Sequence, residues 1–174
     1  MKKLMITAAA LLMACAAYGQ GQFFFNTHDT TAGNVLTFLD ATGNKVTGAD
    51  FFVEVLAGKD ANSLTALTPM LALNRTGAGA GFANPFSATY TVAGMAGGSS
   101  ATVAYRAYEG TSYDSASIKS SQALATSPVV LTEPPTPPNE VALGTANVTL
   151  VPEPTTLALG FIGLGTLLAF RRRS

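Results

Sequence analysis

The chain has 174 residues, a formal net charge of zero and one cysteine, Cys15. This length predicts a single domain with one modest core, which must be stable without disulfides once the first residues are removed. Half of the ten Lys and Arg residues lie near the two ends, so the middle of the chain is mildly acidic and its basic residues are scattered. Nucleic-acid binding requires clustered basic residues, and this pattern excludes it.

A secretory signal peptide is predicted over residues 1–19. Its parts are two lysines, an apolar run and a small-residue end, at Lys2, Lys3, 4–13 and 17–19. We expect cleavage between Gly19 and Gln20. The apolar run is too short to span about 30 Å of hydrocarbon, which argues against an uncleaved anchor.

A lipoprotein site is the alternative at this end of the chain. Residues 12–15 resemble a lipoprotein box, in which Cys15 would be acylated and become the mature N-terminus. Met13 is atypical of that box, so cleavage after Gly19 is the preferred prediction.

The segment from 20 to 151 combines β-branched and aromatic residues with turn signals about every ten residues, which predicts an all-β domain. We expect a single β-sandwich, Ig-like or jelly-roll-like. Its expected strands are 23–26, 35–40, 51–57, 89–93, 102–108, 129–132 and 147–151. Glu54 should face water between inward-facing Val53 and Val55, and Arg106 should lie on the opposite face from Tyr105.

Four connections between these strands have recognisable composition. Residues 41–44 predict a turn after the second strand, and 94–100 predict a loop. The glycine-rich stretch 74–81 is interpreted as a flexible, long hairpin connection. The proline-rich stretch 134–138 predicts a stiff and exposed loop.

Three features follow one another at the C-terminal end. They are a tripeptide, an uncharged run and a basic end: Pro152, Glu153, Pro154, 155–170, Arg171, Arg172 and Arg173. The two prolines prevent a helix and hold the backbone extended. The uncharged run would form about 24 Å of transmembrane helix at about 1.5 Å per residue, a marginal span. The arginines predict a cytoplasmic end, so the body faces outward.

This tail, residues 152–174, resembles the PEP-CTERM sorting domain. The resemblance implies recognition by an exosortase-type membrane protease. It also implies transient anchoring in the membrane by 155–170, and then a cell-surface or extracellular location. The alternative is a permanent single-pass anchor, with glycines in the run forming a loose helix-pairing face.

Candidate catalytic and metal-binding residues are few. His28 is the only histidine, and Asp29 is adjacent to it and poorly placed to orient its ring, so neither a Ser-His-Asp site nor a zinc site is expected. Calcium was considered for Asp40, Asn44 and Asp50, whose spacing matches no EF-hand-like loop. We therefore expect no metal and no cofactor.

Two functions remain as hypotheses for the body. The first is a non-enzymatic cell-surface or extracellular-matrix protein. The second is a carbohydrate-binding or carbohydrate-cleaving module acting on extracellular polysaccharide. For the second hypothesis, a platform for sugar stacking is expected from Tyr105, Tyr108 and Tyr113. Glu109 or Asp114 would act on the sugar, and Glu54 is a further candidate for a pair of carboxylates. The absence of Trp argues against the second hypothesis.

Overall fold

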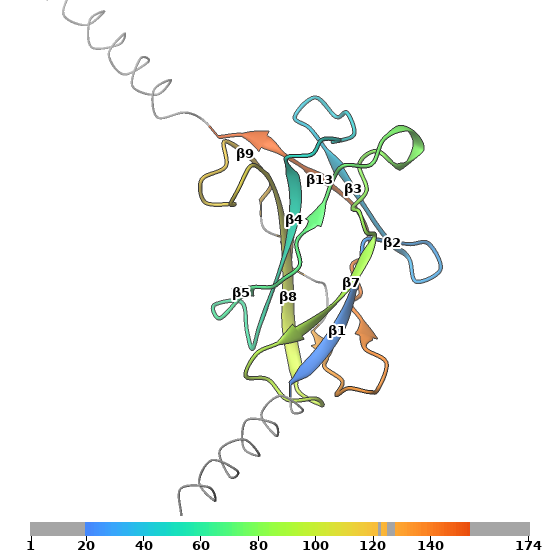
Figure 1. Cartoon of the computed structure of the whole chain (residues 1–174), viewed down its shortest axis with the longest axis vertical. Coiled ribbons are helices and arrows are strands. Elements are labelled where there is room, and N and C mark those ends of the chain that lie inside the picture. Colours follow the sequence, from blue (N-terminus) through green and yellow to red (C-terminus); the bar gives the residue numbers. More distant parts are fainter. Residues whose placement is uncertain (1–19, 122, 125–127, 154–174) are drawn as a thin grey trace, which may run out of the picture.

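The computed structural model describes residues 20–121, 123–124 and 128–153 (Figure 1). These residues are mostly β, with one short 3₁₀ turn, η1 (Gly77–Gly79), and without any α-helix. Within these ranges no helix is long and apolar enough to cross a membrane. The all-β prediction is confirmed. The predicted signal peptide, the membrane run 155–170 and the basic end lie outside the described residues.

The strands form three open sheets (Figure 1). The first contains, in order across the sheet, β12 (Asn139–Glu140), β1 (Gly21–Asn26) and β7 (Ser87–Val92). The second contains β14 (Val151–Pro152), β9 (Ile118–Lys119), β8 (Ser100–Glu109), β4 (Phe51–Gly58) and β5 (Thr65–Ala66). Off this path, β4 also pairs with β6 (Leu71–Ala72), and β8 also pairs with β10 (Ala123–Leu124) and β11 (Val129–Val130). The third contains β13 (Thr145–Thr149), β3 (Asn34–Leu39) and β2 (His28–Asp29).

One hydrophobic core receives side chains from all three sheets. β1 and β3 alternate buried and half-buried residues along their whole length, as a strand with one face on the core should. The ring of Phe23 stacks on Tyr90 with centroids 5.7 Å apart, and Phe25 contacts Tyr105 at 5.9 Å. Burying each such side chain contributes about 1.5–3 kcal/mol, so this aromatic cluster joins the sheets strongly.

The expected strands are all found, with shifted ends. The last one, predicted over 147–151, is divided at Leu150 into β13 and β14. One detail was wrong. Glu54 does not simply face water, because its side chain is only 14% exposed and pairs with Arg106 across β4 and β8. The stretch 74–81 does connect two antiparallel segments, because Ala72 and Asn84 on either side of it form an antiparallel bridge, and the chain then continues into β7.

Parallel pairing of the C-terminal strands was not predicted. β12 runs parallel to β1, and β13 runs parallel to β3. The segment between them is bound by the buried side chain of Asn34. Its amide donates to Glu140 Oε1 at 2.7 Å and to the carbonyl of Val141 at 2.9 Å. Its oxygen accepts the N–H groups of Leu143 and Gly144, so every polar group of the amide is satisfied.

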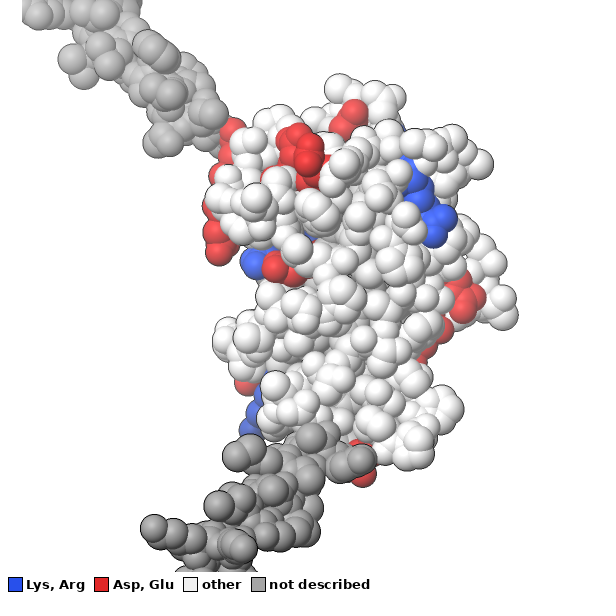
Figure 2. Space-filling model, viewed as in Figure 1, with Lys and Arg blue, Asp and Glu red and all other residues white. Residues whose placement is uncertain are grey.

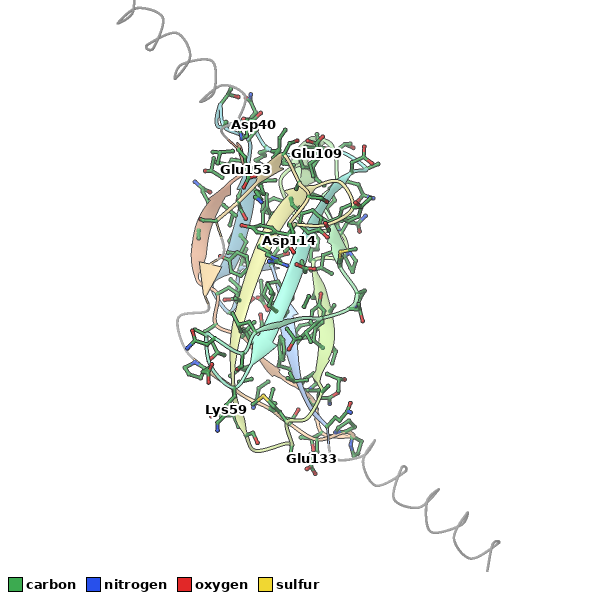
Figure 3. The ribbon with its side chains drawn as sticks, turned by 90° about the vertical axis from the view of Figure 1, so that its left-hand side faces the viewer. Asp40, Lys59, Glu109, Asp114, Glu133 and Glu153 are labelled. Atoms are coloured by element: carbon green, nitrogen blue, oxygen red, sulfur yellow. The ribbon has the colours of Figure 1, made fainter. Side chains whose placement is uncertain are left out.

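The body begins and ends at opposite poles. Near the start of β1, Gln22 forms an antiparallel bridge with Thr132. Figure 3 labels Glu133 and Lys59 at this pole, and Glu153 at the other. Acidic side chains gather toward the pole of Glu153, where Figure 3 also labels Asp40 and Glu109, and charged side chains are sparse over most of the face in Figure 2.

Candidate functional site at the C-terminal edge

The Pro-Glu-Pro tripeptide begins inside the folded body. β14 pairs antiparallel with β9, with Val151 opposite Lys119 and Pro152 opposite Ile118. The N–H of Glu153 then donates to the carbonyl of Ser117 at 2.8 Å. β14 is the edge strand of its sheet, which is where a proline is tolerated because its missing N–H is not needed by a neighbour.

The carboxylate of Glu153 has a basic partner on the neighbouring strand. Lys119 Nζ lies 2.8 Å from Glu153 Oε1. The lysine also donates to the carbonyl of Tyr113 at 3.3 Å and lies 4.9 Å from the centroid of the Tyr113 ring. These contacts fix the ammonium group where the Glu153 side chain reaches it.

A row of polar contacts extends from the centre of this sheet to its edge. Arg106 on β8 pairs with Glu54 on β4, and its guanidinium lies 4.2 Å from the centroid of the Tyr113 ring. The Tyr113 hydroxyl donates to the carbonyl of Ser120 at 2.5 Å. Tyr113 thus lies between Arg106 and Lys119, and the row ends at Glu153.

A shallow hollow of about 270 Å³ lies beside β14. Its walls come from the loop before β9, from the end of β9 and the two residues after it, and from residues 151–153: Tyr113, Lys119, Ser120, Ser121, Val151, Pro152 and Glu153. Pockets that bury a drug-sized ligand have volumes of about 300–1,000 Å³, so this hollow suits a side chain or a peptide segment.

The proposed stacking platform of three tyrosines is not present. Tyr105 and Tyr108 are buried, and the cations of Arg106 and Lys119 lie over the Tyr113 ring. Burial raises the pKa of the Tyr105 and Tyr108 hydroxyls, and the charge of Glu54 raises that of Tyr108 further. Sugar stacking requires an exposed ring face, so the prediction that these residues form an exposed platform was wrong.

His28 belongs to an aromatic cluster and makes no pair with Asp29. Its ring lies 4.5 Å from the ring of Phe82 and 5.1 Å from that of Phe86, measured between centroids. Its Nδ1 is buried and has no hydrogen-bond partner among the described residues. Asp29 instead accepts the N–H groups of Thr31 and Ala32 and so shapes its own turn.

Two cations cover the same rings. Lys45 Nζ lies 5.3 Å from the centroid of Phe82, and the guanidinium carbon of Arg75 lies 3.6 Å from that of Phe86. Arg75 is further fixed by donating to the carbonyl of Ala83. We name Lys45, Arg75, Phe82, Phe86 and His28 the basic–aromatic cluster. The sequence pattern does not reveal it, because its members come from β2, from the connection between β3 and β4 and from that between β6 and β7, and share no regular spacing.

The carboxylates considered for calcium or catalysis have other roles or remain apart. Asp40 accepts hydrogen bonds from the hydroxyl of Thr42 and from the backbone N–H groups of Asn44 and Thr42, which hold its pKa below the usual range. Glu54 is bound to Arg106. In the described part of the chain, no three His, Cys, Asp or Glu residues are grouped so that they could hold a metal ion.

Comparisons with protein-family models, curated proteins and solved structures gave no match for this chain. The C-terminal edge is therefore the feature that links sequence and geometry most directly. Pro152 and Glu153, two of the three residues of the Pro-Glu-Pro tripeptide, contact β9 there, while Pro154 lies outside the described residues.

Proposed function

We propose that this protein is an exported cell-surface or extracellular-matrix protein with a non-enzymatic body. A signal peptide would direct export, and the PEP-CTERM-like tail would be processed by an exosortase-type membrane protease. The observation that supports this best is the position of the tripeptide. β pairing ends at Pro152 and Glu153, so the tripeptide forms the junction between the folded body and the apolar run 155–170.

That junction is where a membrane protease needs its recognition sequence. A run of this length would place the adjacent tripeptide at the outer face of the bilayer, within reach of an enzyme embedded there. The core residue Leu150 lies two residues before the tripeptide. Cleavage beyond it would leave the body intact and release it from the membrane.

We further propose that the body is a single β-sandwich of Ig-like or jelly-roll-like type. The shared core supports this, because residues of all three sheets contribute to one hydrophobic cluster. The length of the body is also that of one such domain.

The test is the intact mass of the protein isolated from its native host, measured separately for membrane and culture medium. We expect a chain that begins at Gln20 and ends between Pro152 and Thr155. Glu153→Gln should retain the tail, whereas Glu133→Gln, at the opposite pole, should be processed normally. A wild-type chain that keeps Arg171–Ser174 would show a permanent anchor and refute the sorting proposal. Acylated Cys15 at the N-terminus would show the lipoprotein alternative.

Binding of an acidic polysaccharide is a second candidate function, favoured by the basic–aromatic cluster. Lys45 and Arg75 form no ion pair within the described residues, and aromatic rings hold both at the surface. Two such cations suit a polymer with carboxylate groups.

Affinity electrophoresis in gels containing alginate, a carboxylated polysaccharide, or neutral dextran tests this second function. Wild type should be retarded by alginate alone, and less so as salt increases. The double variant Lys45→Ala/Arg75→Ala should lose the retardation, and Lys59→Ala should keep it. Equal migration of wild type and double variant in alginate would rule the function out.

A further inference from the structure

We propose that the folded body masks its own sorting tripeptide, so that β14 must leave β9 before the membrane protease can bind. This inference rests on the proposed function and adds a regulation of the same site. It concerns residues 151–153, and Lys119 as the positioning residue.

The tripeptide Pro-Glu-Pro has few polar groups that an enzyme could recognise. Proline has no backbone N–H, so Glu153 supplies the only backbone donor and also the only charge of the tripeptide. The donor is bound to the carbonyl of Ser117 at 2.8 Å, and the carboxylate is bound to Lys119 at 2.8 Å. The body therefore occupies both groups by which an enzyme could recognise Glu153.

The free edge of β14 offers no backbone N–H group from the tripeptide. A peptide that binds in extended form adds to a strand through main-chain hydrogen bonds. Residues along a strand direct their N–H groups alternately to the two edges, and the N–H of Glu153 points to β9. The neighbouring position toward the outer edge is Pro152, which has no N–H to offer. An enzyme that needs a backbone donor from this segment must take it from the edge that β9 covers.

The contact between β14 and β9 can open without unfolding the core. β14 has two residues, the Val151 side chain is among the exposed large apolar ones at 48%, and the Glu153 side chain is 54% exposed. Ion pairs with this exposure contribute little to stability. Leu150, the preceding residue, is 1% exposed and stays in the core. The opening therefore begins between Leu150 and Val151.

Lys119 controls this equilibrium through its position. Its contacts with Tyr113 keep the ammonium group near Glu153 when β14 is docked. Lys119→Glu would place two negative charges together at this edge and favour the undocked strand. Lys59→Glu makes the same change of charge at the opposite pole, where Figure 3 labels Lys59, and is the matched control.

The first measurement is amide hydrogen exchange at Glu153 in the full-length chain in detergent micelles. We expect protection in wild type, Lys119→Arg and Lys59→Glu. Exchange should be about fivefold faster or more in Lys119→Glu, and about two- to fivefold faster in the neutral Lys119→Gln. Circular dichroism melting identifies any variant that fails to fold. If Lys119→Glu does not fold, the exchange rate in Lys119→Gln tests the inference. An unprotected Glu153 amide in wild type would overturn the inference.

The second measurement is a pulse-chase assay of tail removal in the native host. Lys119→Gln and Lys119→Glu should be processed about two- to fivefold faster than wild type, with Lys119→Arg and Lys59→Glu unchanged. A processed wild type whose Lys119 variants are processed no faster would overturn masking and leave the proposed function standing. A wild type that is never processed overturns the proposed function itself, and the exchange measurement still decides whether the strand is docked.

Discussion

Two neighbouring segments close the body in opposite ways. Residues 139–150 pair in parallel with β1 and β3, and their apolar side chains enter the core, as Val148 and Leu150 do. Residues 151–153 lie at the edge of their sheet, paired only with the β9 side, and Val151 and Glu153 are each about half exposed to water. The end of the body is therefore firmly anchored up to Leu150 and detachable from Val151 onward.

The physical cause is the amount of buried apolar surface. Both segments make β-type backbone hydrogen bonds, and each such bond contributes only about 0.5–1.5 kcal/mol net, since water offers the same partners in the unfolded chain. Burial of a whole side chain contributes about 1.5–3 kcal/mol and is absent from 151–153. Substitutions in the two segments should therefore differ in how much they lower the free energy of unfolding.

Truncating the side chain of Leu150 or of Val151, on the two sides of the boundary, should lower the free energy of unfolding by very different amounts. Leu150→Ala removes a fully buried side chain and should lower the free energy of unfolding by about 2–5 kcal/mol. Val151→Ala should change it by less than about 0.5 kcal/mol. Urea denaturation of the two variants measures both values. Similar losses for the two would contradict the boundary between Leu150 and Val151.

The parallel closure should depend on Asn34, which is 2% exposed. Asn34→Ala removes four hydrogen bonds and leaves the N–H of Leu143 buried without a partner, so we expect a loss of about 2–3 kcal/mol in unfolding free energy. Asn44→Ala, in an exposed turn, is the control and should cost less than about 1 kcal/mol. If Asn34→Ala lowers the free energy of unfolding no more than the control, burial of the strands alone holds the segment that Asn34 binds.

Alkaline pH should weaken the core through Tyr90. Burial raises the pKa of this hydroxyl well above its ordinary value of 10.0, so the folded state retains the proton that the unfolded chain releases. Stability is therefore retained below pH 10.0 and falls as pH rises above it. Tyr90→Phe loses a hydrogen bond to the carbonyl of Pro69 and should cost about 1 kcal/mol at neutral pH. Denaturation between pH 7 and 11 should show that the free energy of unfolding declines less steeply in this variant than in wild type. An equal decline in both would contradict the role of Tyr90 in the loss of stability at alkaline pH.

The smallest effect is expected at the detachable segment. Lys119→Gln removes the ion pair with Glu153 and should lower the global unfolding free energy by less than about 1 kcal/mol, because the carboxylate is largely exposed. The same variant should increase exchange at the Glu153 amide. A loss of several kcal/mol would place β14 in the cooperative core and remove the contrast between the two segments.

Local patterns predicted much of the body but little of the candidate site. The alternation of apolar and polar residues predicted the main strands, because a strand that packs one face on the core buries every second residue. It failed for Tyr108, because β8 is buried on both faces and its pattern no longer distinguishes them. It also failed for the basic–aromatic cluster, whose cations and rings are brought together only by folding.

The all-β class, the main strands and the order of the three features in the tail can be predicted from local patterns, because each depends on residues close together in the chain. The parallel pairing of β12 with β1 and of β13 with β3, and the binding of Asn34 to a segment more than a hundred residues away, arise only in the folded protein. Folding also brings Lys119 to Glu153. Pairing between distant strands depends on which edges remain free once the core has formed, and no local pattern encodes that.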